Sequence, residues 1–141
     1  MRHRNKTLKL GRTKPHREQM LANLVCSLIL KGQVRTTRRK ARAASALADR
    51  MITLGKAGDL HSRRLAISRL RQKGAVSKLF GEVAPRCAQR NGGYTRVLKL
   101  AVRRIGDAAD MAILEWTDQA PAADAAPKSE KPADQAKPAA A

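Results

Sequence analysis

A short cationic segment holds the residues whose types and spacing could do chemistry. Residues 35–42 contain five cations and no acid, namely Arg35, Arg38, Arg39, Lys40 and Arg42. Arginine and lysine donate charge-assisted hydrogen bonds to phosphate oxygens, and arginine can donate two in parallel. Solvated surfaces usually mix both signs of charge, so a cluster without acids favours a polyanionic partner. The predicted chemistry is non-covalent recognition of phosphate.

The cluster coincides with the predicted start of a helix. Thr37 can cap a helix that continues to about Leu54. Several cations there face the unfavourable end of the helix dipole. A bound phosphate would reverse that effect, because the N–H groups of the first turn, the dipole and the arginines would all point at one anion. We therefore expect a phosphate cradle in this segment.

A second group of cations lies in residues 1–17. Residues 1–14 offer only Leu8 and Leu10 for burial, so they are predicted to form an extended basic arm. Its candidate phosphate-binding residues, with the start of the following helix, are Arg2, Arg4, Lys6, Lys9, Arg12, Lys14 and Arg17.

A third candidate site is the stretch from Asn91 to Arg96. Gly92 and Gly93 allow the backbone to approach another backbone closely, or they form the turn before a strand. The residues themselves favour the turn. Tyr94 is interpreted either as a core residue or as a ring that stacks on a ribose or base.

Composition points to the same class of partner. The chain has 141 residues, enough for one domain of ordinary size, and a formal net charge of +19. Nucleic acid or an anionic membrane could neutralise that charge. With one Trp, one Tyr and one Phe, the chain is poor in base-stacking platforms, which favours contacts to phosphate and to RNA shape.

Enzyme and cofactor motifs are not found in the sequence. His3, His16 and His61 are separated from one another, and no zinc-protease, nucleophile-elbow or P-loop pattern is present. We expect no catalytic residue, no metal and no cofactor. Cys26 is predicted to be a small buried apolar residue, whereas Cys87 is assigned to a polar loop. No apolar run is long enough to span a membrane.

The elements that must position these residues follow from periodicity and breakers. Four helices are expected: one from Pro15, capped by Thr13, to Gly32; one over residues 37–54; one capped by Asp59 and running to about Gln72; and one over residues 76–83. Gly55 and Gly58 are expected to end the second helix, and Leu60, Ile67 and Leu70 to face inward on the third.

Three strands are predicted, over residues 33–36, 94–102 and 111–116. The last two should form an antiparallel hairpin around Gly106-Asp107. The predicted fold is α+β, with about four helices on a small mixed sheet. Three regions are expected: a basic RNA-binding extension over 1–14, a globular domain over 15–117 and a disordered Ala/Pro-rich tail over 118–141.

Several blocks occur in the order found in one known family. They are MRHR at the start, VRTT at 34–37, ITLGK at 52–56, GGYTRVLKL at 92–100 and GDAADMAILEW at 106–116. In these blocks the chain strongly resembles the family of ribosomal protein seventeen of the bacterial large subunit, over residues 1–117.

The resemblance implies a small α+β domain whose extension lies on large-subunit ribosomal RNA. It also implies a place on the solvent side of the subunit, near the peptide exit tunnel and beside other ribosomal proteins, in the cytoplasm. The RNA-facing role is carried over to Arg2, His3, Arg4, Arg12, Arg35, Thr36, Thr37, Gly92, Gly93, Tyr94 and Arg96. With the basic clusters above, Lys99, Arg103 and Arg104 complete the predicted RNA-binding set.

Two departures from the family pattern fall in the hairpin. Ile105 stands between Arg104 and Gly106, where the family usually runs Arg-Arg-Gly, and Asp110 stands where the family usually has proline. The turn is therefore expected to be one residue longer.

The leading hypothesis is a structural, RNA-binding protein of the large ribosomal subunit. The alternative is a DNA-binding protein of the nucleoid type. A membrane-active helical protein is a third class, and the first helix argues against it because its polar face is only modestly cationic. We expect ribosomal RNA and neighbouring ribosomal proteins as partners, and neither a membrane nor a small-molecule substrate.

Overall fold

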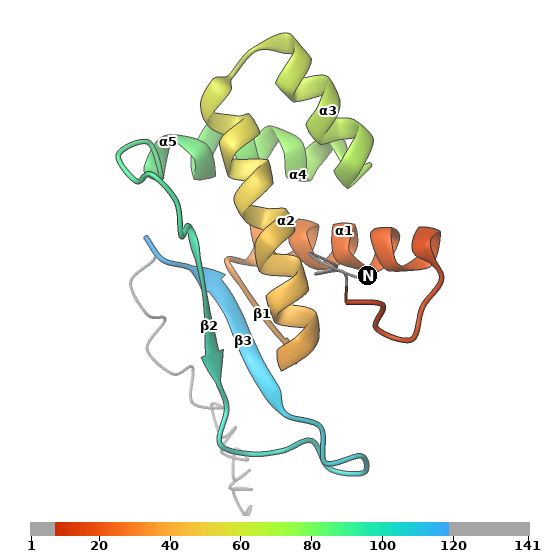
Figure 1. Cartoon of the computed structure of the whole chain (residues 1–141). Coiled ribbons are helices and arrows are strands. Elements are labelled where there is room, and N and C mark those ends of the chain that lie inside the picture. Colours follow the sequence, from red (N-terminus) through yellow and green to blue (C-terminus); the bar gives the residue numbers. More distant parts are fainter. Residues whose placement is uncertain (1–7, 119–141) are drawn as a thin grey trace, which may run out of the picture.

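A computed structural model describes residues 8–118, and the predictions for residues 1–7 and 119–141 lie outside this part. The chain folds into helices that pack against a small sheet (Figure 1). The elements are α1 (Lys14–Lys31), β1 (Gln33–Thr37), α2 (Arg38–Ala57), α3 (Leu60–Leu70), α4 (Lys73–Lys78), the π-helix η1 (Leu79–Val83), α5 (Ala84–Arg86), β2 (Thr95–Lys99) and β3 (Met111–Trp116). The predicted α+β fold is confirmed.

The sheet has three strands in the order β1-β3-β2, so the last strand lies in the middle. Leu114 of β3 is opposite Val34 on one side and Val97 on the other, and both pairings are antiparallel. The predicted hairpin and third strand are confirmed. The expectation of a mixed sheet is wrong, because β3 runs opposite to both of its neighbours.

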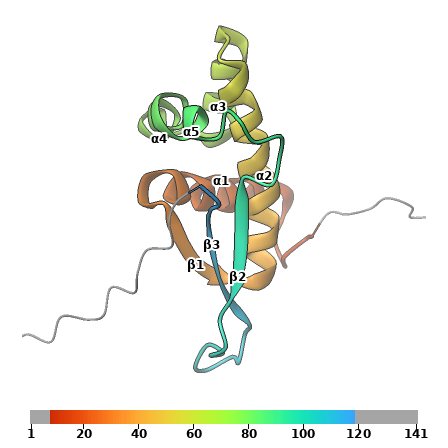
Figure 2. The ribbon, with the colours of Figure 1, turned by 90° about the vertical axis from the view of Figure 1, so that its left-hand side faces the viewer.

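The two faces of the sheet have different surroundings. Ala112, Leu114 and Trp116 are buried against the helices, and the Trp116 ring N–H donates to the Leu28 carbonyl oxygen at 3.3 Å. In Figure 2 the strands lie in front of α1 and α2, and no helix of residues 8–118 covers the face of the sheet that is turned to the viewer. Alternation along β3 therefore sends one set of side chains to the core and the other to the open face.

The first helix supplies much of the core. Val25, Leu28 and Ile29 are fully buried, at the spacing that places them on one face of α1. Gly32 ends the helix with a φ of +82°, a conformation that favours glycine, and its N–H donates to the Leu28 carbonyl oxygen. Cys26 is buried beside them, as predicted.

The second helix is longer than predicted, because Gly55 does not end it. Gly55 is buried inside α2, and a Cβ atom there would lie 2.8 Å from the Ala84 Cβ. This glycine allows α2 and α5 to approach closely. The helix ends instead at Gly58, where φ is +72°.

The third helix begins as predicted but buries a different face. The Asp59 carboxylate accepts the Ser62 N–H at 2.8 Å, as an N-cap should. Leu70 is buried, whereas Leu60 and Ile67 are 63% and 36% exposed, so their predicted inward orientation is wrong. A short helix at the edge of the molecule buries only a narrow stripe, here centred on Ala66.

The predicted fourth helix is a longer, irregular helical segment. It begins at Lys73 and continues through η1 and α5, with Pro85 in the first turn of α5. Cys87 follows this segment and is buried, contrary to its assignment to a polar loop, and burial is the main cause that raises the pKa of its thiol to about 11.

Candidate nucleic-acid interface

The start of α2 and the β2–β3 hairpin loop together form a cleft. It has a volume of about 530 Å³, and α2 contributes Arg38, Arg39, Lys40 and Arg42 to its lining. The hairpin loop contributes Arg104, Asp107 and Asp110. The loop projects beyond the end of the sheet on the side where α2 begins (Figure 1). Two segments that are far apart in the chain therefore meet at one basic surface.

The N-terminal end of α2 lacks the side-chain capping hydrogen bond that was predicted for Thr37. Thr37 has extended backbone angles but accepts no capping hydrogen bond through its side chain, and the first turn contains no acid. The hairpin loop supplies a backbone partner instead, because the Arg38 N–H donates to the Asp110 carbonyl oxygen at 2.9 Å. The positive end of the dipole is thus left without a carboxylate on its own helix.

The cations of α2 in this cleft have no acidic partner. Within residues 8–118, no carboxylate lies within 4 Å of the side-chain nitrogens of Arg38, Arg39, Lys40 or Arg42. Arg39 and Arg42 are exposed, while Arg38 and Lys40 are half-buried. These side chains can therefore donate to an external anion without first breaking an ion pair.

The arginines of the hairpin loop are paired. Arg104 donates to the Asp107 carboxylate through Nε at 2.8 Å, and the Arg103 Nε lies 3.6 Å from an Asp110 carboxylate oxygen. The hydrogen bond from Arg104 lowers the pKa of Asp107 to about 2. The loop is therefore locally neutral, although both arginines belong to the RNA-binding set predicted from the sequence.

The open face of the sheet carries two more candidates. Arg35 lies opposite Ile113, and Arg96 lies opposite Glu115, on the face that no described helix covers. Arg96 forms an ion pair with Glu115, whereas Arg35 is exposed and forms none within residues 8–118. Thr36 and Lys99 lie opposite Ala112 on the helix-facing side, at the end of the sheet near the hairpin loop.

The paired glycines lie at the opposite end of β2 from the hairpin loop. Gly92 and Gly93 have φ values of +136° and +61°, and the space around both is open. Tyr94 is 6% exposed and belongs to the core. These observations support the turn and core interpretations of this stretch.

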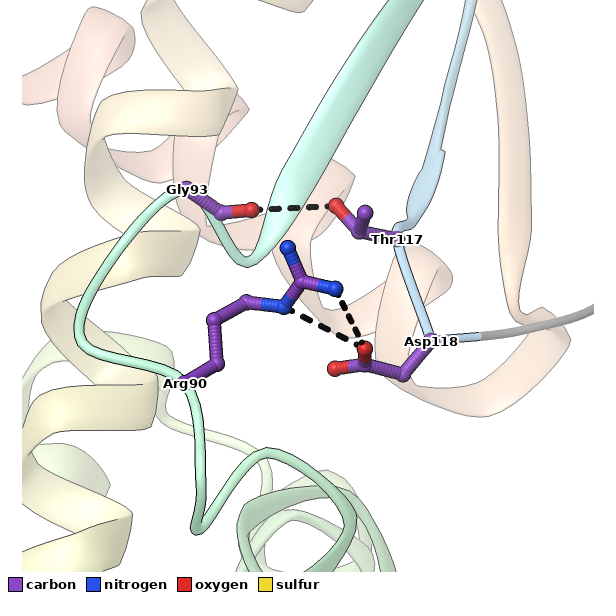
Figure 3. Close-up of polar contacts among 4 residues, drawn as sticks. All are labelled: Arg90, Gly93, Thr117 and Asp118. Atoms are coloured by element: carbon purple, nitrogen blue, oxygen red, sulfur yellow. Dashed lines mark hydrogen bonds and ion pairs between the residues drawn. The ribbon is translucent and has the colours of Figure 1, made fainter.

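The loop that contains the glycines is tied to the end of β3 (Figure 3). The Thr117 hydroxyl donates to the Gly93 carbonyl oxygen at 3.0 Å, and the Arg90 guanidinium forms two hydrogen bonds with the Asp118 carboxylate. Asp118, which the sequence analysis assigned to the tail, thus contacts the domain.

The described part of the basic arm forms a turn before α1. Leu10 and Gly11 both have positive φ, and the Arg17 guanidinium donates to the carbonyl oxygens of Lys9 and Arg12. Lys9 and Lys14 are exposed. Predictions for Arg2, His3, Arg4 and Lys6 lie outside the described residues.

A further group of arginines lies outside the RNA-binding set predicted from the sequence. Arg50, Arg69 and Arg71 line a groove of about 520 Å³ between α1, α2 and α3. Arg50 shares a helical face with Arg39, which is a spacing that the sequence alone displays. The convergence of Arg69 and Arg71 on that face required the tertiary structure.

The described residues offer little for other kinds of site. Residues 8–118 contain no group of three or more His, Cys, Asp or Glu residues placed to hold a metal ion. In the same part of the chain, no helix is long and apolar enough to cross a membrane.

Comparison with known proteins gives a consistent result. The sequence model of the family described as ribosomal protein L17 matches residues 20–117. A large ribosomal subunit protein bL17 of Desulfotalea psychrophila is 53% identical over 115 residues, which cover 82% of this chain and 88% of the relative. Proteins of the same name from Akkermansia muciniphila and Thermodesulfovibrio yellowstonii are each 49% identical over 133 residues, which cover 94% of this chain and 96% and 99% of the relatives.

Proposed function

Because the chain belongs to the ribosomal protein L17 family, we propose that it binds and stabilises large-subunit ribosomal RNA through contacts to phosphate and RNA shape. Membership in this family of structural ribosomal proteins confirms the resemblance seen in the sequence and the prediction that the chain is not an enzyme. The chain works in the cytoplasm, within the large subunit, with neighbouring ribosomal proteins around it.

One observation carries the proposal of RNA binding. The start of α2 presents four cations without acidic partners in the described chain, at the positive end of a 20-residue helix and in an open cleft. A phosphate there would receive charge-assisted hydrogen bonds from side chains and the favourable end of the dipole. Neutralisation would also relieve the self-repulsion of a chain with a net charge of +19.

The other residues of the predicted RNA-binding set differ in how readily they can contact phosphate. Further phosphate contacts come from Arg35 on the open face of the sheet, from Lys99 at the end of the sheet near the hairpin loop, and from Lys9, Arg12 and Lys14 at the start of α1. Arg96, Arg103 and Arg104 are secondary contacts, because each must share or leave a carboxylate before it binds phosphate. The place near the peptide exit tunnel on the solvent side is supported by family membership alone.

Sedimentation of cell lysate through a sucrose cushion, at moderate and at high salt, tests the function. The protein is expected in the fraction of large ribosomal subunits. Recovery with chromosomal DNA instead would favour the alternative of a nucleoid protein. Hydroxyl-radical footprinting of the purified protein on large-subunit ribosomal RNA would then map the contacts, including any near the exit tunnel.

A further inference from the structure

The groove between α1, α2 and α3 has a basic rim and an apolar floor. Arg50 comes from α2, while Arg69 and Arg71 come from the end of α3, and the partly buried side chains of Leu21 and Leu47 lie below them. Figure 1 shows α1 and α3 on the same side of α2. The groove is therefore a built feature of helix packing, on a different part of α2 from the cleft at its start.

The rim arginines are free of acidic partners. Within residues 8–118, none of Arg50, Arg69 and Arg71 lies within 4 Å of a carboxylate oxygen. The Arg71 guanidinium donates instead to the Gln19 side-chain oxygen at 3.0 Å, which holds it at the α1 side of the groove. Glu18 is the one acid in the described lining, so the groove carries a net positive charge.

The groove also continues a surface that begins at the start of α2. Arg39, Ala43, Ala46 and Arg50 follow one another at intervals of three or four residues, so they share one helical face. The rise of 1.5 Å per residue separates Arg39 from Arg50 by about 16 Å along the axis. The alanines between them have short side chains, so an extended RNA strand that lies along this face can contact cations at both ends.

From this arrangement we propose that the groove binds the sugar–phosphate backbone of an RNA strand, as a second contact beyond the start of α2. Arg50, Arg69 and Arg71 donate to phosphate oxygens, and the apolar floor packs against ribose. The inference rests on the proposed function and extends it. Continuity with Arg39 favours RNA over an acidic segment of a neighbouring protein as the occupant.

The test is the salt dependence of binding to a transcript of bacterial large-subunit ribosomal RNA. The double variant Arg50→Gln, Arg69→Gln is expected to flatten the slope of log K against log salt by roughly 1.4 to 1.8 units, since each lost phosphate contact contributes roughly 0.7 to 0.9. The matched control is Arg86→Gln, Arg90→Gln, which removes two exposed arginines that pair with Glu82 and Asp118 and that line neither the groove nor the cleft. This control should flatten the slope by less.

A second variant tests the sign of the effect in the same groove. Glu18→Gln removes the one acid of the described lining, so RNA should bind more tightly and with a steeper salt slope. Thermal unfolding of every variant, followed by circular dichroism, separates loss of contact from loss of fold.

Two results would overturn the proposal for the groove. The first is that the variant Arg50→Gln, Arg69→Gln shows the same salt slope of RNA binding as the wild type or as the control variant. The other is a double variant that keeps RNA binding but no longer binds a neighbouring ribosomal protein. Failure of the proposed function looks different: the wild-type protein would then show a slope near zero, and the variant Arg38→Gln, Arg39→Gln, Arg42→Gln would bind RNA as the wild type does.

Discussion

The start of α2 and the β2–β3 hairpin loop line the same cleft, but the arginines of the loop have carboxylate partners and those of α2 have none in the described chain. At the start of α2, Arg38, Arg39 and Arg42 contact no carboxylate of the described chain. In the hairpin loop, Arg103 and Arg104 pair with Asp110 and Asp107. Both regions look basic when only their cations are counted.

The difference determines which region can gain from a phosphate. An unpaired arginine releases only water and counterions when it binds RNA, whereas a paired one must also lose or share its carboxylate. The acids of the hairpin loop additionally repel an approaching phosphate. The start of α2 should therefore supply most of the affinity, and the loop should shape the cleft and supply the backbone cap for Arg38.

Removal of the unpaired arginines gives the largest expected effect. The variant Arg38→Gln, Arg39→Gln, Arg42→Gln should flatten the salt slope of RNA binding by roughly two to three units, because three phosphate contacts are lost. Filter binding to a large-subunit ribosomal RNA transcript over a range of salt concentrations measures this slope.

The matched control removes three paired arginines, Arg96, Arg103 and Arg104, again by substitution with Gln. Here the slope should flatten by less than roughly one unit, because these side chains are already neutralised. Equal losses in the two triple variants would contradict the distinction between paired and unpaired arginines.

Removal of Asp107 and Asp110 should leave the loop arginines unpaired, as the arginines at the start of α2 are. In the variant Asp107→Asn, Asp110→Asn, the two arginines are freed at the edge of the cleft, and the salt slope should steepen by roughly one to two units. The Asp107 carboxylate accepts the Ala109 N–H at 3.3 Å. The amide oxygen of the substituted side chain can accept the same N–H, so the turn is expected to persist.

Glu82→Gln is the control for this gain. It frees Arg86 on α5, which does not line the cleft. An equal gain in affinity from this control would show that total charge, and not the position of the freed arginines, determines binding.

The ion pair of the loop can also be measured directly. The Arg104 hydrogen bond lowers the pKa of Asp107 from 3.8 to about 2. A lowered carboxyl pKa contributes stability that is present above pH 3.8 and is lost as the pH falls through about 2. NMR titration of the Asp107 carboxyl carbon should show a midpoint near 2, and Arg104→Gln should return the midpoint toward 3.8. A normal midpoint in the wild-type protein would mean that the loop arginine is free in solution.

The pattern of the sequence was sufficient for the elements but not for these pairings. The apolar spacing from Val25 to Ile29, the Asp59 cap and the hairpin around Gly106 are local signals, and each is found where it was predicted. Arg96 and Glu115 pair across strands, so their contact depends on a register that no local signal reports.

The local sequence pattern also did not predict which side chains are buried at the edges of the domain. Leu60 and Ile67 have the chemistry of core residues, yet α3 packs through Ser62, Ala66 and Leu70. Gly55 reads as a helix breaker until α5 is seen to pack against it. The groove arginines were missed for the same reason, since α2 and α3 must first be packed before Arg50, Arg69 and Arg71 converge.

The smallest expected effect concerns another paired arginine, Arg90, at the other end of the sheet. The Asp118 carboxylate lies 2.9 Å from the Arg90 guanidinium, and the adjacent Thr117 hydroxyl donates to the Gly93 carbonyl oxygen (Figure 3). The Thr117 N–H also donates to the Tyr94 carbonyl oxygen. Both side chains of the ion pair are partly exposed, so the pair should contribute only about 0.2–1 kcal/mol to the free energy of unfolding.

Two variants separate this contact from the sequence that follows it. Asp118→Asn in the full chain should lower the free energy of unfolding by about 0.2–1 kcal/mol and leave RNA affinity nearly unchanged, because the freed Arg90 lies far along β2 from the cleft. Truncation after Asp118 keeps the ion pair, so both its stability in urea and its incorporation into large subunits should match those of the full chain. If the truncated protein unfolds earlier, or is displaced from subunits by the full-length chain, residues 119–141 contribute to stability or assembly beyond anything their composition indicates.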